Sequence, residues 1–223
     1  APNVDQNAFE NIRLIKGAGT LKYTGDTPGG VVVLESKTPT IKDSLYGKTI
    51  LNGMTNGQGM NLMSSWVNSY QSGTYFKIQA TIKKNGDFSA PDYILSNTGK
   101  TENNFSFSLG RNKILSHWKL GYSFFSNEIG ILRSAHIGNA NDLLRAIKSP
   151  VPLIINPFGY DLNAPKQRNE HHTTTFQYSK RNLSNGKWSA NYSWQRNNRK
   201  EYDIRRGVNK NNASVDLLLN THT

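Results

Sequence analysis

The chain of 223 residues contains no cysteine and carries a formal net charge of +12. Its hydrophobic fraction is 35%, and no stretch approaches the roughly 20 consecutive apolar residues that a membrane-spanning helix requires. These figures exclude disulfides, thiolate metal sites and a helical membrane protein. The basic residues are scattered and match no nucleic-acid-binding motif, so we do not expect nucleic acid as a partner.

The first 44 residues differ in pattern from the rest of the chain. They open with Ala-Pro-Asn-Val-Asp and not with the basic and apolar regions of a signal peptide. We therefore expect a processed start or an internal piece of a longer chain. The run Glu10–Tyr23 leads through small residues to a Gly-Gly-Val-Val-Val stretch that begins at Gly29. Glycines in such a stretch permit positive φ and close approach between backbones.

From about residue 45 onward the sequence alternates with period two, which predicts antiparallel strands with two unlike faces. On residues 188–195, aromatic and apolar side chains occupy one face, and Ser, Asn and Gln occupy the other. The same alternation recurs on 75–82, 105–110 and 118–124. A water-soluble sheet also alternates in this way. The Trp, Tyr and Phe on one face, opposite small polar residues, favour a barrel wall between lipid and a wet lumen.

The predicted connections alternate in length. Short turns are predicted near Gln71–Thr74, Arg111–Lys113 and Ser184–Lys187, and long links at Asn85–Lys100 and Arg133–Asn169. Short turns at one end and long loops at the other are typical of outer-membrane barrels. The sequence predicts seven or eight strands in all, the last of them ending at the C-terminus of the chain.

Two local patterns complete the prediction of elements. Within the longest link, apolar residues at helical spacing predict a short helix over 139–148, capped by Asn141. Gly53, Gly57 and Gly59 are not followed by the Lys-Ser/Thr pair of a phosphate-binding loop. They predict a hairpin between two strands instead.

The pattern of the first 44 residues resembles the closing segment of the plug domain in TonB-dependent outer-membrane receptors. There, a strand ending in Lys/Arg-Gly is followed by a small-residue turn, a Tyr-Gly pair and a Gly-Gly-Val-Val strand. Stretches at 83–99, 128–132 and 216–223 resemble receptors from Bacteroidetes-like bacteria, so the resemblance extends along the chain. The family often has an acid at the position of Arg13. The residues that match the plug motif are Lys16, Gly17, Tyr23, Gly29, Gly30 and Val31.

This resemblance implies an all-β fold in two parts. Residues 1–40 would be the C-terminal segment of the plug domain, and residues 41–223 the N-terminal part of a transmembrane antiparallel β-barrel. Plugged outer-membrane transporters use about 22 strands. Seven or eight strands would then be part of a larger barrel, and we expect the remaining strands from sequence beyond these residues.

The resemblance further implies an active transporter in the bacterial outer membrane for a scarce nutrient, such as siderophore-bound iron, haem, cobalamin or an oligosaccharide. The TonB–ExbB–ExbD complex would act through an N-terminal part outside this sequence. Other implied partners are outer-membrane lipid, the nutrient ligand, and a surface lipoprotein or larger assembly. One alternative is a receptor-like barrel that serves as a structural or adaptor subunit of an outer-membrane assembly. Another is a secreted β-sandwich that binds glycans through exposed aromatic side chains.

No motif of a catalytic nucleophile occurs, so we expect neither enzymatic activity nor a cofactor. The adjacent His171 and His172 would point to opposite faces of a strand, which excludes joint binding of one metal ion. Charged and aromatic residues of the predicted outer loops are candidates for substrate contact, because a ligand arriving from outside would meet these loops first. Each of them, taken singly, is equally well explained as a solvated loop residue. The candidates are Asp87, Asp92, Tyr93, Arg133, His136 and Arg168.

Overall fold

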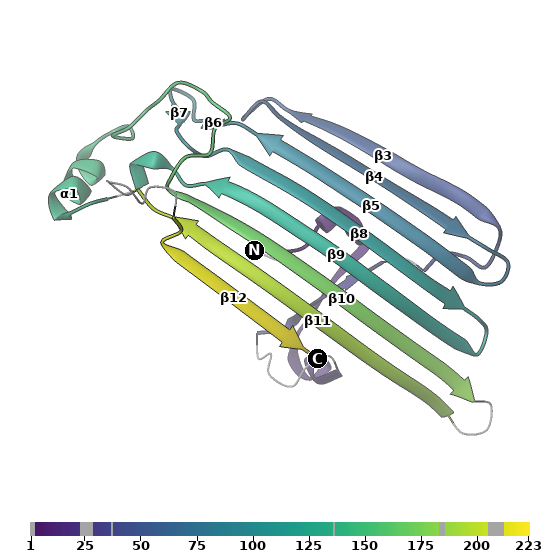
Figure 1. Cartoon of the computed structure of the whole chain (residues 1–223). Helices are drawn as coiled ribbons and strands as arrows, with labels where there is room; N and C mark the ends of the chain where they lie inside the picture. The colour runs from purple at the N-terminus through teal and green to yellow at the C-terminus, as the bar shows by residue number, and fades with distance from the viewer. Residues whose placement is uncertain (1–2, 23–28, 37, 136, 183–185, 205–211) are drawn as a thin grey trace.

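The computed structural model describes residues 3–22, 29–36, 38–135, 137–182, 186–204 and 212–223. Within these residues, eight strands form one antiparallel sheet in the order β12–β11–β10–β9–β8–β5–β4–β3 (Figure 1). The all-β prediction is therefore confirmed. The strands of this sheet are β3 (Ser44–Met54), β4 (Gly59–Ser69), β5 (Thr74–Asn85), β8 (Lys100–Asn112), β9 (Ser116–Gly130), β10 (Lys166–Asn182), β11 (Gly186–Tyr202) and β12 (Val215–His222).

Shorter elements precede the sheet or lie in its connections. The N-terminal segment, residues 3–36, contains η1 (Gln6–Ala8), β1 (Asn11–Ile15), η2 (Gly17–Lys22) and β2 (Val31–Glu35). The connection after β5 contains the paired strands β6 (Phe88–Ser89) and β7 (Ile94–Leu95), and the connection after β9 contains η3 (Arg133–Ala135) and α1 (Ala140–Lys148). The boundary expected near residue 40 falls between β2 and β3.

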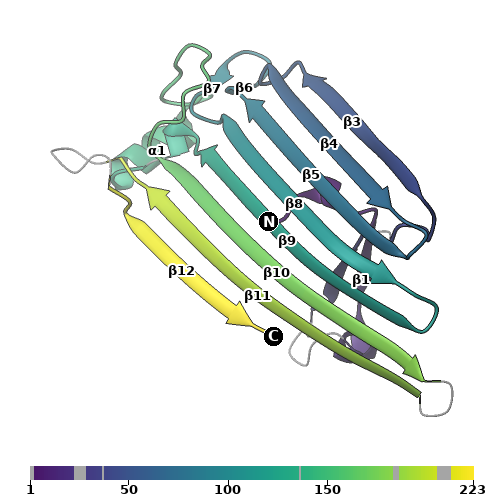
Figure 2. The same ribbon diagram turned by 45° about the vertical axis from the view of Figure 1, so that its right-hand side comes forward.

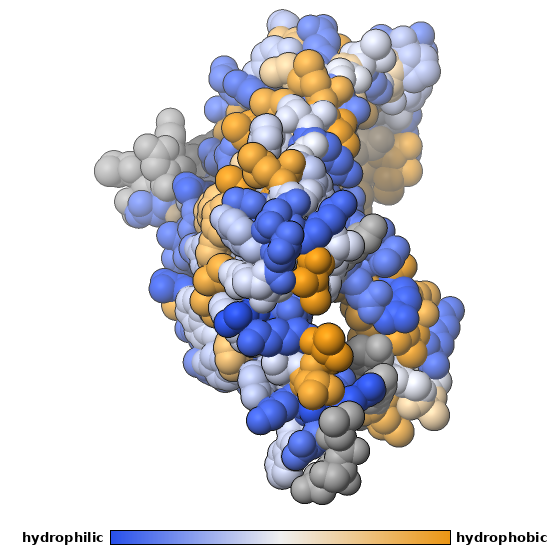
Figure 3. All heavy atoms as spheres, turned by 90° about the vertical axis from the view of Figure 1, so that its right-hand side faces the viewer, coloured by the Kyte–Doolittle hydropathy of each residue, from blue (hydrophilic) through white to orange (hydrophobic). Residues whose placement is uncertain are grey.

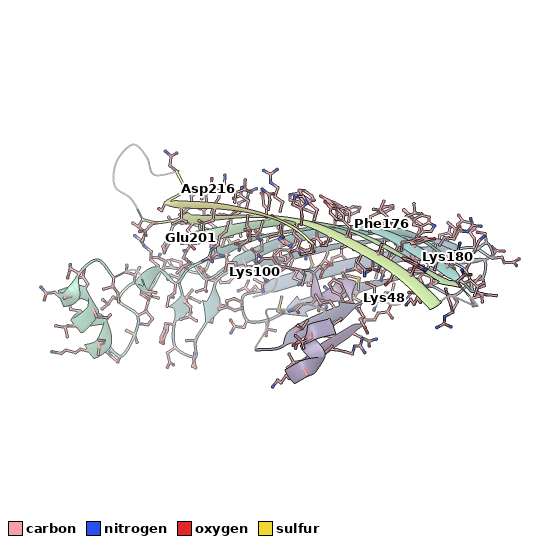
Figure 4. The ribbon with its side chains drawn as sticks, turned by 90° about the horizontal axis from the view of Figure 1, so that it is seen from below. Lys48, Lys100, Phe176, Lys180, Glu201 and Asp216 are labelled. Carbon is pink, nitrogen blue, oxygen red and sulfur yellow. The ribbon has the colours of Figure 1, made fainter. Side chains whose placement is uncertain are left out.

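The sheet has two unlike faces, as the period-two pattern predicts. The outer face carries Phe105 and Phe124 as register partners, and also Phe176. The inner face carries Lys48 and Gln79, and the N-terminal segment lies against it (Figures 2 and 4). Phe176 and Lys48 project to opposite sides of the sheet in Figure 4.

Burial on these two faces is inverted relative to a water-soluble sheet. On the outer face, Trp188 is 72% exposed and Leu45 is 69% exposed. On the inner face, Gln79 is 3% exposed and Thr81 is fully buried. Water drives apolar side chains inward, so this pattern leaves a large apolar surface without cover. Within the described residues, the buried hydrophobic side chains are Met63, Val67, Tyr75 and Phe125, and all four belong to the inner face.

The apolar outer face ends at a polar boundary that crosses several strands in register. On β8 and β9 the change falls between the pair Phe105–Phe124 and the pair Asn103–Ser126. The same level continues onto β10 at Glu170, the register partner of Ser126. Beyond this line, toward the long connections, the outer face carries ion pairs. These are Lys166–Glu128 at 2.7 Å, Arg168–Glu170 at 2.6 Å and Lys200–Asp216 at 3.4 Å.

The predicted connections agree with the structure where it describes them, apart from the end of the longest link. Short turns join β4 to β5 and β8 to β9 at one end of the sheet, which we refer to as the short-turn end. The long links and the predicted glycine-rich hairpin lie at the opposite end, the loop end. Gly57 in that hairpin has φ 80°, a conformation that glycine adopts without strain. The third predicted short turn, at residues 183–185, lies outside the described residues.

The predicted helix is present, but its predicted cap is wrong. The helix α1 begins at Ala140, and its N-cap is Asn139, whose side chain accepts a hydrogen bond from the backbone N–H of Asp142. Asn139 has the extended backbone, φ −161°, that an N-cap needs, whereas Asn141 already lies within the first turn. The prediction also placed the end of the longest link too late, since β10 begins at Lys166.

Candidate functional site: the loop cavity and the inner face

A buried carboxylate joins the two long connections at the loop end. Asp87 is 6% exposed. Its Oδ1 accepts a hydrogen bond from the Thr98 amide at 2.9 Å, and its Oδ2 accepts one from the Gly159 amide at 3.3 Å. The Asp87 amide donates in turn to the Gly159 carbonyl oxygen at 2.9 Å. A charged acceptor shared by backbone amides of two loops holds them together more strongly than neutral groups would.

A buried asparagine makes a second junction between the same two connections. Asn97 has φ 65°, in the left-handed region that Asn tolerates better than most residues. Its Nδ2 donates to the carbonyl oxygens of Ile131 at 2.8 Å and Pro165 at 2.9 Å. Its Oδ1 accepts from the Asn163 amide at 2.9 Å. One side chain thus hydrogen-bonds three backbone groups inside the loops, and the Pro165 carbonyl oxygen also accepts from the Ile131 amide at 2.9 Å.

A cavity of about 640 Å³ lies between these loops and the connection that follows β11. Its volume falls within the range of small-molecule sites. The wall is polar and carries both signs of charge, so it suits a polar ligand with hydrogen-bonding groups more than an apolar one. Polar residues of the wall include Asp87, Asn97, Arg133, Asn156, Asp161 and Asp203.

Arg133 is the basic side chain of this wall. Its backbone N–H donates to the carbonyl oxygen of Ser96 at 3.0 Å, which fixes the start of η3 against the preceding loop. Its Nη1 is buried and has no hydrogen-bond partner within the described residues. A buried donor without an acceptor costs free energy, so an acceptor that reached this Nη1 would stabilise the loop, although the atom itself is closed off from the cavity.

The structure brings together two of the six predicted outer-loop contacts. Asp87 and Arg133 both line the cavity. Asp92 and Tyr93 lie in the connection between β6 and β7, outside the cavity wall. Arg168 lies on the outer face of β10 and pairs with Glu170. His136 lies outside the described residues.

The residues of the predicted plug motif form the tight pair β1–β2. Ile15 lies opposite Val31 in the antiparallel register. Gly17 has φ 68° and Gly30 has φ 113°, and a Cβ at Gly30 would lie 2.9 Å from the Ile15 carbonyl oxygen. Both glycines thus have the positive φ that the sequence predicts, and Gly30 also has the close backbone approach, whereas nothing lies within 4 Å of a Cβ placed on Gly17.

The remaining plug-motif residues play smaller parts in the described structure. Lys16 is exposed, Gly29 lies in the turn before β2, and Tyr23 lies outside the described residues. Arg13 pairs with Glu35 of β2, within the N-terminal segment itself.

A second buried carboxylate fastens the N-terminal segment to the inner face. Asp5 Oδ2 accepts hydrogen bonds from Thr81 Oγ1 at 2.6 Å and from Gln79 Nε2 at 3.1 Å. Its Oδ1 accepts from the Asn7 amide at 3.0 Å and caps η1. Asp5 thus joins the segment to the sheet by hydrogen bonds, and Ala8, Phe9 and Ser36 also face the sheet across a small cavity.

A smaller cavity of about 350 Å³ separates the same segment from the loop-end half of the inner face. It contains a buried ion-pair cluster around Glu102, which is 3% exposed. Glu102 accepts from Lys83 Nζ at 2.8 Å and from Lys100 Nζ at 2.6 Å. Asn104 Nδ2 adds a third hydrogen bond at 2.8 Å, so the carboxylate is fully paired.

The two adjacent histidines lie on opposite faces of β10. His172 faces outward, and its Nδ1 lies 2.9 Å from Tyr122 Oη. His171 faces inward, and its Nδ1 lies 3.2 Å from Asn197 Nδ2. Within the part of the chain that the structure describes, no cluster of three metal-ligating side chains is present.

Sequence reasoning did not find Asp5, Asn97 and Glu102, whose partners are distant in sequence. Asn97 had a usable signal, because Asn before a Thr-Gly pair favours a left-handed turn. The signal for Asp5 was weaker: an acidic residue just before a helical turn can act as its N-cap, as Asp5 does by accepting from the Asn7 amide. Glu102 had none, since its role depends on the register of β5 against β8.

Comparison with known proteins adds no relative to this picture: no family model matches the chain, and neither a curated protein nor a solved structure matches it. None of the described helices is long and apolar enough to span a bilayer. The features that bear on function are therefore the two faces of the sheet and what lies against each.

Proposed function

We propose that these residues form part of the barrel wall and plug of a TonB-dependent outer-membrane transporter for a scarce nutrient. The inverted burial of the sheet carries this proposal. An exposed outer face of Trp, Phe and Leu beside a buried polar inner face suits lipid on one side and a wet, plugged lumen on the other. A water-soluble sheet would place these faces the other way round.

The distance between the charged residues that bound the outer face fits a bilayer. On β10 the outward positions between Glu170 and Lys180 are His172, Thr174, Phe176 and Tyr178. The span of about ten residues is about 33 Å along the strand. A tilt of about 40° reduces this to about 25 Å across the membrane, which is the usual height of the apolar band in such barrels.

The two edges of the sheet also support a larger wall. The edge strands β3 and β12 each pair on one side only within the described residues. Unpaired backbone groups are not tolerated against lipid. In the proposed barrel, further strands pair with both edges. The same residues form a single large sheet, which favours the barrel wall over the alternative of a β-sandwich.

In this proposal the N-terminal segment acts as the closing part of the plug. It lies against the inner face through Asp5 and leaves the outer face uncovered (Figure 4). Polar contacts between a plug and a wall can be exchanged for contacts with water at modest net cost. Such an attachment suits a plug that is moved by force from TonB.

An uptake experiment tests the proposal. Cells that contain or lack the full protein are given labelled ferric siderophores, haem, cobalamin or oligosaccharides. We expect uptake of one class to require the protein and to stop when the proton gradient is collapsed. Uptake that is identical in both strains for every class would contradict transport and favour the structural or adaptor role.

A further inference from the structure

Two half-buried lysines of the inner face lie under the N-terminal segment. Lys77 on β5 and Lys119 on β9 are close enough for their charges to repel each other. Among the described residues, neither forms an ion pair or a side-chain hydrogen bond. The charge of Lys48 adds to the repulsion at Lys77, and the charge of Glu10 opposes it. Positive charge therefore exceeds negative charge at a place where the segment keeps part of the water away.

The strand register places a basin of small side chains between these two lysines. Lys77, Ser108, Gly121 and Thr175 are successive register partners across β5, β8, β9 and β10. Lys119 lies one inward-facing position beyond Gly121 on the same strand, toward the short-turn end. The next row toward the loop end adds three hydroxyl-bearing residues, Ser106, Ser123 and Thr173.

The floor of the basin presents hydroxyl groups that are free to donate. A Cβ placed on Gly121 would lie 2.9 Å from Thr175 Oγ1, so this hydroxyl lies over the glycine. The hydroxyls of Ser108 and Thr175 form no hydrogen bond within the part of the chain that the structure describes. A hydroxyl group can turn its proton toward an acceptor that enters the basin.

The N-terminal segment covers this basin and leaves a cavity of about 150 Å³, with Ala8, Phe9 and Ser36 on the covering side. Figure 3 looks from the short-turn end and shows the segment beside the sheet with an opening between the two. The volume is below the roughly 300 Å³ at which sites for small organic molecules begin, so the cavity does not fit a nutrient. It has room for a small inorganic ion and a few waters, each of which occupies about 30 Å³ in the liquid.

We propose that this basin binds a small tetrahedral oxyanion, such as inorganic phosphate, between the N-terminal segment and the sheet. Lys77 and Lys119 contact the anion from two sides, and the hydroxyls of Ser108 and Thr175 donate to it from the floor. Ammonium and hydroxyl groups are all donors here, and an oxyanion offers several charged acceptor oxygens in different directions. The anion removes the repulsion between the lysines, so its binding favours the state in which the segment covers them. The site goes beyond the proposed transport and does not depend on it.

Isothermal titration calorimetry with inorganic phosphate tests the site on the full protein in detergent, at an ionic strength held constant with chloride. We expect saturable binding. The variant K77Q/K119Q should weaken the association at least about tenfold, because a hydrogen bond to a charged group contributes roughly tenfold or more. Thr175→Val removes one hydroxyl and keeps the shape of the side chain, and it should weaken the association about threefold.

A matched variant and a second readout control for charge and for folding. The variant K113Q/K180Q removes two exposed lysines outside the cavity and should bind phosphate like the unmodified protein. Phosphate should also slow trypsin cleavage after Lys16 in the unmodified protein, and not in K77Q/K119Q, because the anion favours the covered state. Absence of binding by the unmodified protein would overturn the site. Equal affinity in K77Q/K119Q, or an equal loss in K113Q/K180Q, would overturn it as well.

Discussion

Within the described residues, Asp5 makes the hydrogen bonds that join the N-terminal segment to the sheet. Its two carboxylate oxygens contact Gln79, Thr81 and the amide of Asn7. Gln79 and Thr81 are buried, so they have no water to replace this acceptor. Removing the carboxylate would leave buried donors unpaired, which costs more than the loss of an exposed hydrogen bond.

We expect Asp5→Ala to loosen the segment by roughly 1–3 kcal/mol. Limited trypsin cleavage after Lys16, followed by mass spectrometry, measures this as a faster cut. Asp5→Asn retains an acceptor oxygen and should lie between Asp5→Ala and the unmodified chain. An unchanged cleavage rate in Asp5→Ala would show that other contacts hold the segment.

Asn97 combines a backbone role and a side-chain role, and two substitutions separate them. Asn97→Gly keeps the positive φ but loses the three hydrogen bonds, so we expect it to loosen the 131–165 connection. Asn97→Ala adds backbone strain of roughly 1 kcal/mol and should loosen the connection further. Hydrogen exchange at the Asn163 amide, which donates to Asn97, reports both effects. Equal exchange in the two variants would mean that the positive φ contributes nothing.

At the scale of elements, the strands follow from the sequence because their signal is local. Trp188, Ala190, Tyr192 and Trp194 alternate with polar residues, and they share the outer face in the structure. Period-two alternation depends only on the geometry of an extended chain, so it can be recognised in the sequence without knowing which strands are neighbours.

The loop site does not follow from the sequence, because its contacts are long-range. Asp87 reaches Gly159, and Asn97 reaches Asn163 and Pro165, across intervening strands. The sequence identified Asp87 as a loop residue exposed to ligand, whereas the structure shows it 6% exposed and bonded to two loop amides. Composition alone cannot distinguish a carboxylate that meets a ligand from one that organises a loop.

The turn between β4 and β5 offers a test at the same scale. Gly73 has φ 81°, and a Cβ there would lie 1.8 Å from the Asn112 carbonyl oxygen of the neighbouring strand. We expect Gly73→Ala to destabilise the sheet by about 2 kcal/mol or more, through both strain and the clash. Gly53 on β3 has open space around it and no positive φ, so Gly53→Ala is the matched control. Urea unfolding would contradict the account if both variants matched the unmodified protein.

At the scale of the whole molecule, the two faces of β10 should tolerate charge very differently. Phe176 lies near the middle of the outward apolar band, and its neighbour Gln177 faces inward. In a bilayer, Phe176→Lys should cost about 2–4 kcal/mol, because a lysine at the midplane of a barrel is poorly solvated. Gln177→Lys should cost little. Folding yield into lipid vesicles measures the difference, and equal yields would argue that neither face meets lipid.

The most direct test of the lipid-facing wall is a spin-label scan along β10. The chain has no cysteine, so single cysteines at positions 172–179 can each carry one label. In the reconstituted protein, the account predicts that labels at 172, 174, 176 and 178 collide mainly with oxygen, which concentrates in lipid. Labels at 173, 175, 177 and 179 should collide mainly with a water-soluble nickel chelate or be shielded from both. Accessibility to the chelate at every position, without a two-residue period, would contradict the barrel wall.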